Sequence, residues 1–283
     1  MIDVHCHLNF HPFEKNIDEV VAAARLAGVK AIVNVGTSLE SSIKAVELAH
    51  KFSDMYAIVG IHPHHADKLV PGLQSSSPPA GLKVTGDWIG ELEKIALSST
   101  KVIGIGEIGL DYYSYKSNGI VDPKIQKEVF IKQIELAHKL NLPLQIHNRH
   151  AGEDVVDVLK KFKHLLKDVP GMFHCFAATK EVLKEVLDMG FYIGFDGNIT
   201  YKGLAPGETV ELKDLAINTP LDRIFVETDS PYLTPVPLRG AQNKPENVII
   251  TAQFIAGIKN KTNTYFQQTI YNNFRTVFGV EIK

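Results

Sequence analysis

The chain has 283 residues, of which 45% are hydrophobic and 22% are charged, a composition typical of globular proteins and unlike disordered or collagen-like chains. Its formal net charge of −2 argues against a strongly basic, high-affinity nucleic-acid binder and leaves room for a transient, enzymatic contact. No run of about 18 apolar residues occurs, so we expect no membrane-spanning helix and no membrane partner.

Eight short runs rich in Val, Ile and aromatic residues predict β-strands. In chain order they are Ile2–His5, Ala31–Gly36, Tyr56–Ile61, Val102–Glu107, Pro143–His147, Gly171–His174, Phe191–Phe195 and Arg223–Glu227. Amphipathic segments between them predict helices over Asn16–Ala27, Ser41–His50, Pro123–Leu140, Glu153–Leu166 and Lys180–Leu187, with two more between Pro245 and Phe278. Such alternation indicates a parallel sheet with right-handed crossovers.

Eight strand–helix units are the number that closes a (β/α)8 TIM barrel, and about 250 residues is the usual length of that single-domain fold. We therefore predict an α/β protein with one barrel domain over residues 1–283. An open, doubly wound sheet is the alternative, weakened because no Gly-x-Gly-x-x-Gly motif follows the first strand. The segment Val70–Gly86, rich in Pro, Ser and Gly, is expected to be a surface insertion after the third strand.

The two cysteines, Cys6 and Cys175, are too few for a disulfide scaffold, and we expect both to be reduced and buried. No secretory signal or transit peptide is recognisable at the N-terminus. A cytoplasmic location is therefore expected, or a nuclear one in a eukaryote.

Ionisable side chains fall where the predicted strands end. His5 and His7 lie two residues apart on one face of the first strand. The other strand-end residues are Glu107, His147, His174 and Asp229, with His62 after the third strand. In a parallel barrel these positions meet at the C-terminal rim, where barrel enzymes place their chemistry.

Four histidines and two carboxylates exceed the needs of one tetrahedral ion and suit two divalent ions about 3.5–4 Å apart that share a bridging carboxylate. Imidazole ligands favour Zn, Mn or Co over Mg, although Mg stays possible. Glu227, two residues before Asp229, is interpreted as a buried structural acid paired with a basic neighbour or as a group that supports a ligand.

Arg149 and Arg239 are candidates to bind an anionic substrate, because guanidinium matches the geometry of phosphate. Several tyrosines lie in predicted rim loops and can stack on nucleobases: Tyr112, Tyr113, Tyr115, Tyr201 and Tyr232.

The motifs together resemble the TatD-type metal-dependent deoxyribonucleases of the amidohydrolase-like superfamily. The resemblance is carried, in the order of that family, by IDVHCHL, GIHPHHAD, IGIGEIGLDYY, LQIHNRH, FHCF, GFYIGFDGNITY and ETDSPYLTPVPLRGAQNKPENV, and it extends to near Phe278. It implies a (β/α)8 barrel with two divalent metal ions that hydrolyses phosphodiester bonds in DNA, often as a 3′→5′ exonuclease on single strands.

Carried over by position, the resemblance implies a first metal on His5, His7 and Asp229, a second on His147 and His174, and a bridging Glu107. Some positions depart from the family pattern and bear on substrate preference: the longer 70–86 segment, Ala177-Ala178, Asp196 and His150.

The working hypothesis is two-metal hydrolysis of DNA, with Glu107 and Asp229 as catalytic residues and Asp229 as the proton acceptor. His62 and Arg149 are expected at the scissile phosphate, and Tyr112 or Tyr113 against a terminal base. One alternative is a hydrolase of a small-molecule ester, lactone or amide with the same metals, because fold does not fix function. Another is a non-catalytic scaffold, which predicts a missing ligand, whereas all six candidates are present.

Overall fold

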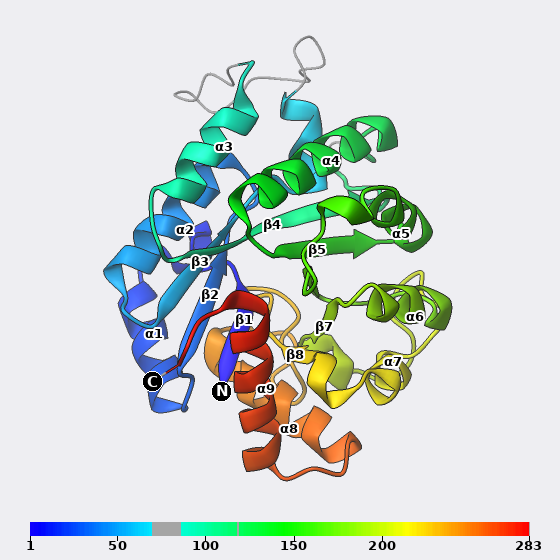
Figure 1. Ribbon diagram of the computed structural model, residues 1–283. Coiled ribbons are helices and arrows are strands. Elements are labelled where there is room, and N and C mark those ends of the chain that lie inside the picture. The colour runs from blue at the N-terminus through cyan, green and yellow to red at the C-terminus, as the bar shows by residue number, and fades with distance from the viewer. Residues whose placement is uncertain (70–85, 118, 283) are drawn as a thin grey trace.

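The computed structural model describes residues 1–69, 86–117 and 119–282. Within them, eight parallel strands form one sheet in which the spatial order of the strands follows the chain, β1 to β8 (Figure 1). The strands are β1 Ile2–Cys6, β2 Ala31–Val35, β3 Met55–Val59, β4 Val102–Asp111, β5 Leu144–Arg149, β6 Gly171–Phe173, β7 Tyr192–Phe195 and β8 Ile224–Val226. This order confirms the predicted (β/α)8 barrel and rules out a doubly wound sheet, whose strand order reverses at a switch point.

The sheet closes between β1 and the segment that follows β8. The N–H of His7 donates to the carbonyl of Ser230 over 2.8 Å, and the N–H of Asp229 donates to the carbonyl of His5 over 3.0 Å. Cys6 and Ser230 form a parallel bridge between these hydrogen bonds. The seam of the barrel therefore places two predicted ligands of β1 beside a third ligand from the other end of the chain.

Helices surround the sheet, and α8 and α9 lie beside β8 (Figure 1). They are α1 Ile17–Leu26, α2 Leu39–Lys51, α3 Trp88–Leu97, α4 Pro123–Leu140, α5 Gly152–Lys161, α6 Lys180–Asp188, α7 Leu212–Asn218, α8 Val248–Ile258 and α9 Asn263–Phe278. The helices predicted with bounds include neither α3 nor α7. Local chemistry sets several ends, as in α4, which begins at Pro123 after the capping side chain of Asp122 and stops at left-handed Asn141.

Several predicted boundaries differ from the structure, and three of them bear on the argument. The helix expected to reach Leu166 ends at Lys161, because Phe162 leaves the α-helical region and a short 3-10 turn follows. β4 continues past Glu107 to Asp111, and β5 continues past His147 to Arg149. Both strands therefore carry polar side chains further over the rim than expected. The predicted 70–86 insertion lies almost wholly outside the described residues.

The core lies inside the barrel and between the strands and the helices. Every residue of β1, β2 and β4 is buried, which is the pattern of a parallel sheet covered on both faces. Among the described residues, no helix combines the length and the apolar character needed to cross a bilayer.

Candidate metal centre

Two imidazoles at the end of β1 aim their unprotonated nitrogens at the same point. The Nδ1–H of His5 donates to Oε1 of Gln145 over 2.9 Å, and the Gln145 amide is itself oriented by a hydrogen bond to the carbonyl of Val4. The Nδ1–H of His7 donates to the carbonyl of Val35 over 2.9 Å. In the neutral rings both Nε2 atoms consequently carry lone pairs, and they lie only 3.0 Å apart.

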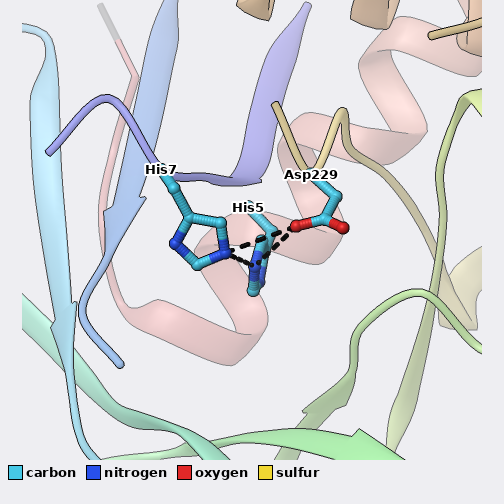
Figure 2. A group of neighbouring side chains, drawn as sticks. All are labelled: His5, His7 and Asp229. Carbon is cyan, nitrogen blue, oxygen red and sulfur yellow. Dashed lines mark hydrogen bonds and ion pairs between the residues drawn. The ribbon is translucent and has the colours of Figure 1, made fainter. Parts of the chain in front are cut away.

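Asp229 completes this group from the opposite side of the barrel seam (Figure 2). Its Oδ1 lies 3.5 Å from Nε2 of His5 and 3.3 Å from Nε2 of His7. The backbone of Asp229 is left-handed, with φ of 50°, a conformation that L-residues other than Asn and Asp seldom adopt. We name His5, His7 and Asp229 the first cation group.

Glu107 of β4 lies between the first cation group and a second set of imidazoles. Its Oε2 is 3.8 Å from Nε2 of His5 and 3.7 Å from Nε2 of His7. Its Oε1 is 2.6 Å from Nδ1 of His147 and 2.7 Å from Nε2 of His174. We name His147, His174 and Oε1 of Glu107 the second cation group. One carboxylate thus offers one oxygen to each group, which is the arrangement of a bridging ligand.

His62 also reaches the second cation group, since its Nε2 lies 3.5 Å from Oε1 of Glu107. His62 was expected at the phosphate of a substrate. Its ring also packs edge-on against that of His147, with centroids 4.3 Å apart, so the structure allows either a ligand or a substrate contact from this side chain.

Burial and close charges shift the protonation of the cluster strongly. Burial and the neighbouring imidazoles hold the pKa of His5 well below its usual value. Burial also acts to lower the pKa of His147, but its hydrogen bonds to Asp111 and Glu107 raise it to about 10. Burial acts to raise the pKa of Glu107, yet the imidazoles around it hold that pKa well below its ordinary value. The cluster therefore favours an ionised carboxylate with positive charge beside it.

The donor set fits divalent cations. Two Nε2 lone pairs at 3.0 Å repel each other unless a proton or a cation lies between them. A divalent cation that displaced the proton shared by Nδ1 of His147 and Oε1 of Glu107 over 2.6 Å would be bound by the same two atoms. The ligand atoms of the first cation group lie within 4.8 Å of one another, as do those of His62, Glu107 and His147. Mixed imidazole and carboxylate ligands suit Zn, Mn or Co better than Mg.

Two further acids lie behind this cluster. Glu227 accepts a hydrogen bond from the backbone N–H of Cys175, and one of its carboxylate oxygens lies within 4.8 Å of ring nitrogens of His5 and His174, which agrees with its interpretation as a buried acid beside basic neighbours. Oε2 of Glu227 and both carboxylate oxygens of Asp196 are buried without a hydrogen-bond partner in the part of the chain described. Burial raises the pKa of Glu227 well above its ordinary value and that of Asp196 to about 7.

Some of the predicted substrate-binding residues lie beside the candidate ligands, and others make their contacts elsewhere. Arg149 lies over the ring of Tyr113, with its guanidinium carbon 3.8 Å from the ring centroid, on the strand that carries His147. The hydroxyl of Tyr112 instead donates to Asp154 of α5. Arg239 lies over Tyr201, 3.9 Å from its ring centroid. No hydrogen bond or ion pair between described residues joins Tyr112 or Arg239 to the candidate ligands.

Sequence reasoning missed two residues that orient ligands, Gln145 beside His5 and Asp111 beside His147. The signal for Gln145 was its place two residues before His147, on the same face of β5. Asp111 was not predicted to lie near the ligands because the fourth strand was expected to stop at Glu107. Both cysteines are free, as expected. Cys6 is buried, whereas Cys175 is partly exposed, so the expectation of burial was wrong for Cys175.

Comparison with known proteins agrees with this geometry. The family model described as TatD related DNase matches residues 2–279. The chain is 36% identical to an uncharacterized metal-dependent hydrolase, YabD of Bacillus subtilis, over 99% of both chains. It is 30% identical to the 3′-5′ ssDNA/RNA exonuclease TatD of Klebsiella pneumoniae, over 100% of this chain and 99% of the other. Among solved structures, the TatD homologue YjjV of Escherichia coli matches with a TM-score of 0.82 at 25% identity, covering 99% of this chain and 98% of that one.

Proposed function

The chain belongs to the family of TatD-related DNases, and from this premise we propose that it is a metal-dependent hydrolase that cleaves phosphodiester bonds in DNA. We propose more specifically that it removes nucleotides from the 3′ ends of single strands, which it binds transiently. The exonuclease activity named for the Klebsiella relative supports this direction. The observation that carries the proposal is Glu107, which presents one oxygen to His5 and His7 and the other to His147 and His174.

The first cation group would hold one divalent ion and the second cation group another, with Glu107 shared between them. Two such ions supply positive charge that lowers the pKa of water and offsets the charge developing on the phosphoryl oxygens. The residues of the chain fix that chemistry in place, because Gln145 and the carbonyl of Val35 hold His5 and His7 in the tautomers that leave Nε2 free.

Asp229 is the proposed proton acceptor. Its side chain is 15% exposed, whereas that of Glu107 is 4% exposed, so Asp229 reaches the open side of the cluster where water and substrate arrive. It would take the proton from the attacking water and return it to the leaving O3′ oxygen, which balances the hydrolysis. His62 and Arg149 would contact the phosphate, and Tyr113 would stack on the terminal base.

The test is hydrolysis of 5′-labelled single- and double-stranded DNA with added Mn, Co, Zn or Mg. We expect a ladder of single strands shortened from the 3′ end, abolished by a chelator. Asp229→Ala should lower kcat/KM by about 10³-fold while the far-UV circular dichroism stays unchanged. Undiminished activity in this variant contradicts the role of Asp229.

A parallel assay with lactones, p-nitrophenyl esters and a phosphotriester distinguishes the nuclease from the alternative, a small-molecule hydrolase. Intact DNA together with metal-dependent turnover of one of these small molecules would replace the nuclease proposal by that of a small-molecule hydrolase.

A further inference from the structure

Asp111 is a buried carboxylate at the end of β4 that contacts a candidate ligand without belonging to either cation group. Its Oδ2 lies 3.1 Å from Nε2 of His147 and accepts a hydrogen bond from the hydroxyl of Tyr115 over 2.7 Å. Its Oδ1 accepts the backbone N–H of Tyr113 over 2.9 Å. Asp111 is only 2% exposed, so these contacts are screened little by water.

The contact with His147 determines which nitrogen of that ring faces the second cation group. A carboxylate accepts hydrogen bonds and does not donate them, so Nε2 of His147 must carry the proton that points at Asp111. Nδ1 is then the nitrogen that faces Oε1 of Glu107, 2.6 Å away. A hydrogen bond of this kind fixes the tautomer and the ring orientation of a metal-binding histidine.

Asp111 is itself held in place by a second pair of hydrogen bonds. Its N–H donates to Oε1 of Gln126 and its carbonyl accepts from Nε2 of the same side chain, both over 2.8 Å. Gln126 is a buried residue of α4. Two residues before Asp111, Gly109 pairs with His147 across the sheet, and a Cβ at Gly109 would lie 2.0 Å from the carbonyl oxygen of His147. The backbones of β4 and β5 therefore meet closely beside the ligand.

The Asp111 carboxylate also binds two tyrosines of the rim, Tyr113 and Tyr115. The hydroxyl of Tyr115, which donates to Asp111, accepts a hydrogen bond from Nη1 of Arg149 over 3.3 Å. Arg149 in turn stacks on Tyr113, whose N–H is bound to Asp111. We name Tyr113, Tyr115 and Arg149 the rim plate.

We propose that Asp111 is a positioning residue that fixes Nδ1 of His147 toward the second cation group and, through the same carboxylate, sets the rim plate that receives the substrate strand. The part that concerns the rim plate rests on the proposed function, whereas the part that concerns His147 concerns metal binding alone. One buried carboxylate would thus link cation binding to the placement of the substrate.

The experiment compares four variants of the full chain by calorimetric titration with Mn²⁺ and by the visible absorption of bound Co²⁺. In Asp111→Asn, one amide end must face a donor, either Nε2–H of His147 or N–H of Tyr113, so the preferred tautomer is lost. We expect one of the two sites to weaken by about 10–100-fold and its Co²⁺ spectrum to change, while the other site keeps its affinity. Asp154→Asn, which alters a carboxylate that binds Tyr112 and not a histidine, should leave both sites unchanged.

Tyr115→Phe isolates the rim plate, because it removes a hydroxyl and leaves the contact between Asp111 and His147. We expect unchanged metal affinity, a KM for single-stranded DNA raised about 3–10-fold and an unchanged kcat. Asp111→Glu keeps the charge and displaces it, and should weaken the same site less than Asp111→Asn does. If Asp111→Asn does not fold, Asp111→Glu carries the comparison.

Equal weakening of both sites, or unchanged affinity in a folded Asp111 variant, would overturn the inference. The titrations contain no DNA, so a wild-type protein that fails to cut DNA but shows the selective loss would retain the role of Asp111 at His147 and lose the proposed function.

Discussion

The two ends of the barrel treat buried polar groups in opposite ways. At the N-terminal end, the ammonium of Lys101 donates to the carbonyls of Ala49, Phe52 and Ser53, and the terminal amine of Met1 donates to the carbonyl of Gly28. At the C-terminal end, Nε2 atoms of His5 and His7 lie 3.0 Å apart, and buried carboxylate oxygens of Glu227 and Asp196 have no hydrogen-bond partner among the residues that the structure describes. The first end uses its polar groups to satisfy the backbone, whereas the second leaves potential ligand atoms close to one another, which is the arrangement that the proposed cation sites need.

The substitution expected to have the largest effect at the C-terminal end is Glu107→Gln. The amide has nearly the same size, but it bears no charge and cannot bridge two cations with two anionic oxygens. We expect kcat/KM for DNA to fall by at least about 10³-fold, equivalent to about 4 kcal/mol, with a native circular dichroism spectrum. Retained activity together with two bound metals per chain would show that the rim is not built around this carboxylate.

A buried carboxylate at the rim should lower the stability of the protein when it ionises. Asp196 tests this expectation. Burial raises its pKa to about 7 from an ordinary value near 3.8, so the folded state holds a proton that the unfolded state releases. Unfolding free energy should therefore fall as pH rises from about 4 to 7 and stay low above that. Asp196→Asn removes this loss, and we expect it to stabilise the protein by on the order of 2–4 kcal/mol at pH 8 and not at pH 4.

Denaturant unfolding at both pH values, at constant metal content, measures the effect. Asp154→Asn serves as the control of opposite sign, since the hydrogen bond from Lys127 lowers the pKa of Asp154. A stabilisation by Asp196→Asn that is equal at both pH values would mean that packing, and not ionisation, governs this site.

The difference between the two ends also decides what the sequence could predict. The carboxyl ends of parallel strands meet at one rim, so strand-end residues such as His5, Glu107 and Asp229 could be brought together from the pattern alone. Asp111 could not, because the strand was expected to end before it and only the β4–β5 register places it against His147. The direction of Tyr112, whose hydroxyl turns to Asp154, depends on loop geometry that hydrophobic periodicity does not encode.

At the N-terminal end, Lys101→Met should cost stability and leave catalysis alone. The substitution keeps most of the apolar stem and removes a charged donor that serves three carbonyls at the end of α2. We expect a loss of about 1–3 kcal/mol in unfolding free energy and a kcat/KM within twofold of wild type. Urea unfolding and the DNA assay measure the two quantities, and a large loss of activity in the folded variant would erase the distinction between the ends.

The smallest effect concerns the outer rim, where two arginines stack on tyrosines. Arg149 is half-buried on Tyr113 and is tied to Asp111 through Tyr115, whereas Arg239 is exposed on Tyr201. Lysine keeps the charge and loses the planar donor fork, so Arg149→Lys should raise the KM for single-stranded DNA about 5–10-fold, about 1 kcal/mol, with kcat unchanged.

Arg239→Lys is the matched comparison, because it makes the same chemical change on the same type of stacked pair. No hydrogen bond among the described residues ties Arg239 to the cation groups, so we expect its KM effect to stay within about twofold. Steady-state kinetics on one oligonucleotide rank the two variants. The reverse ranking would place the proposed path of the DNA strand over the loops that follow β7 and β8, and not over the rim above β5. Equal and negligible effects would instead indicate that the cation groups alone hold the phosphate. The difference between the two ends of the barrel would then be confined to the cation groups and would not include the stacked arginines.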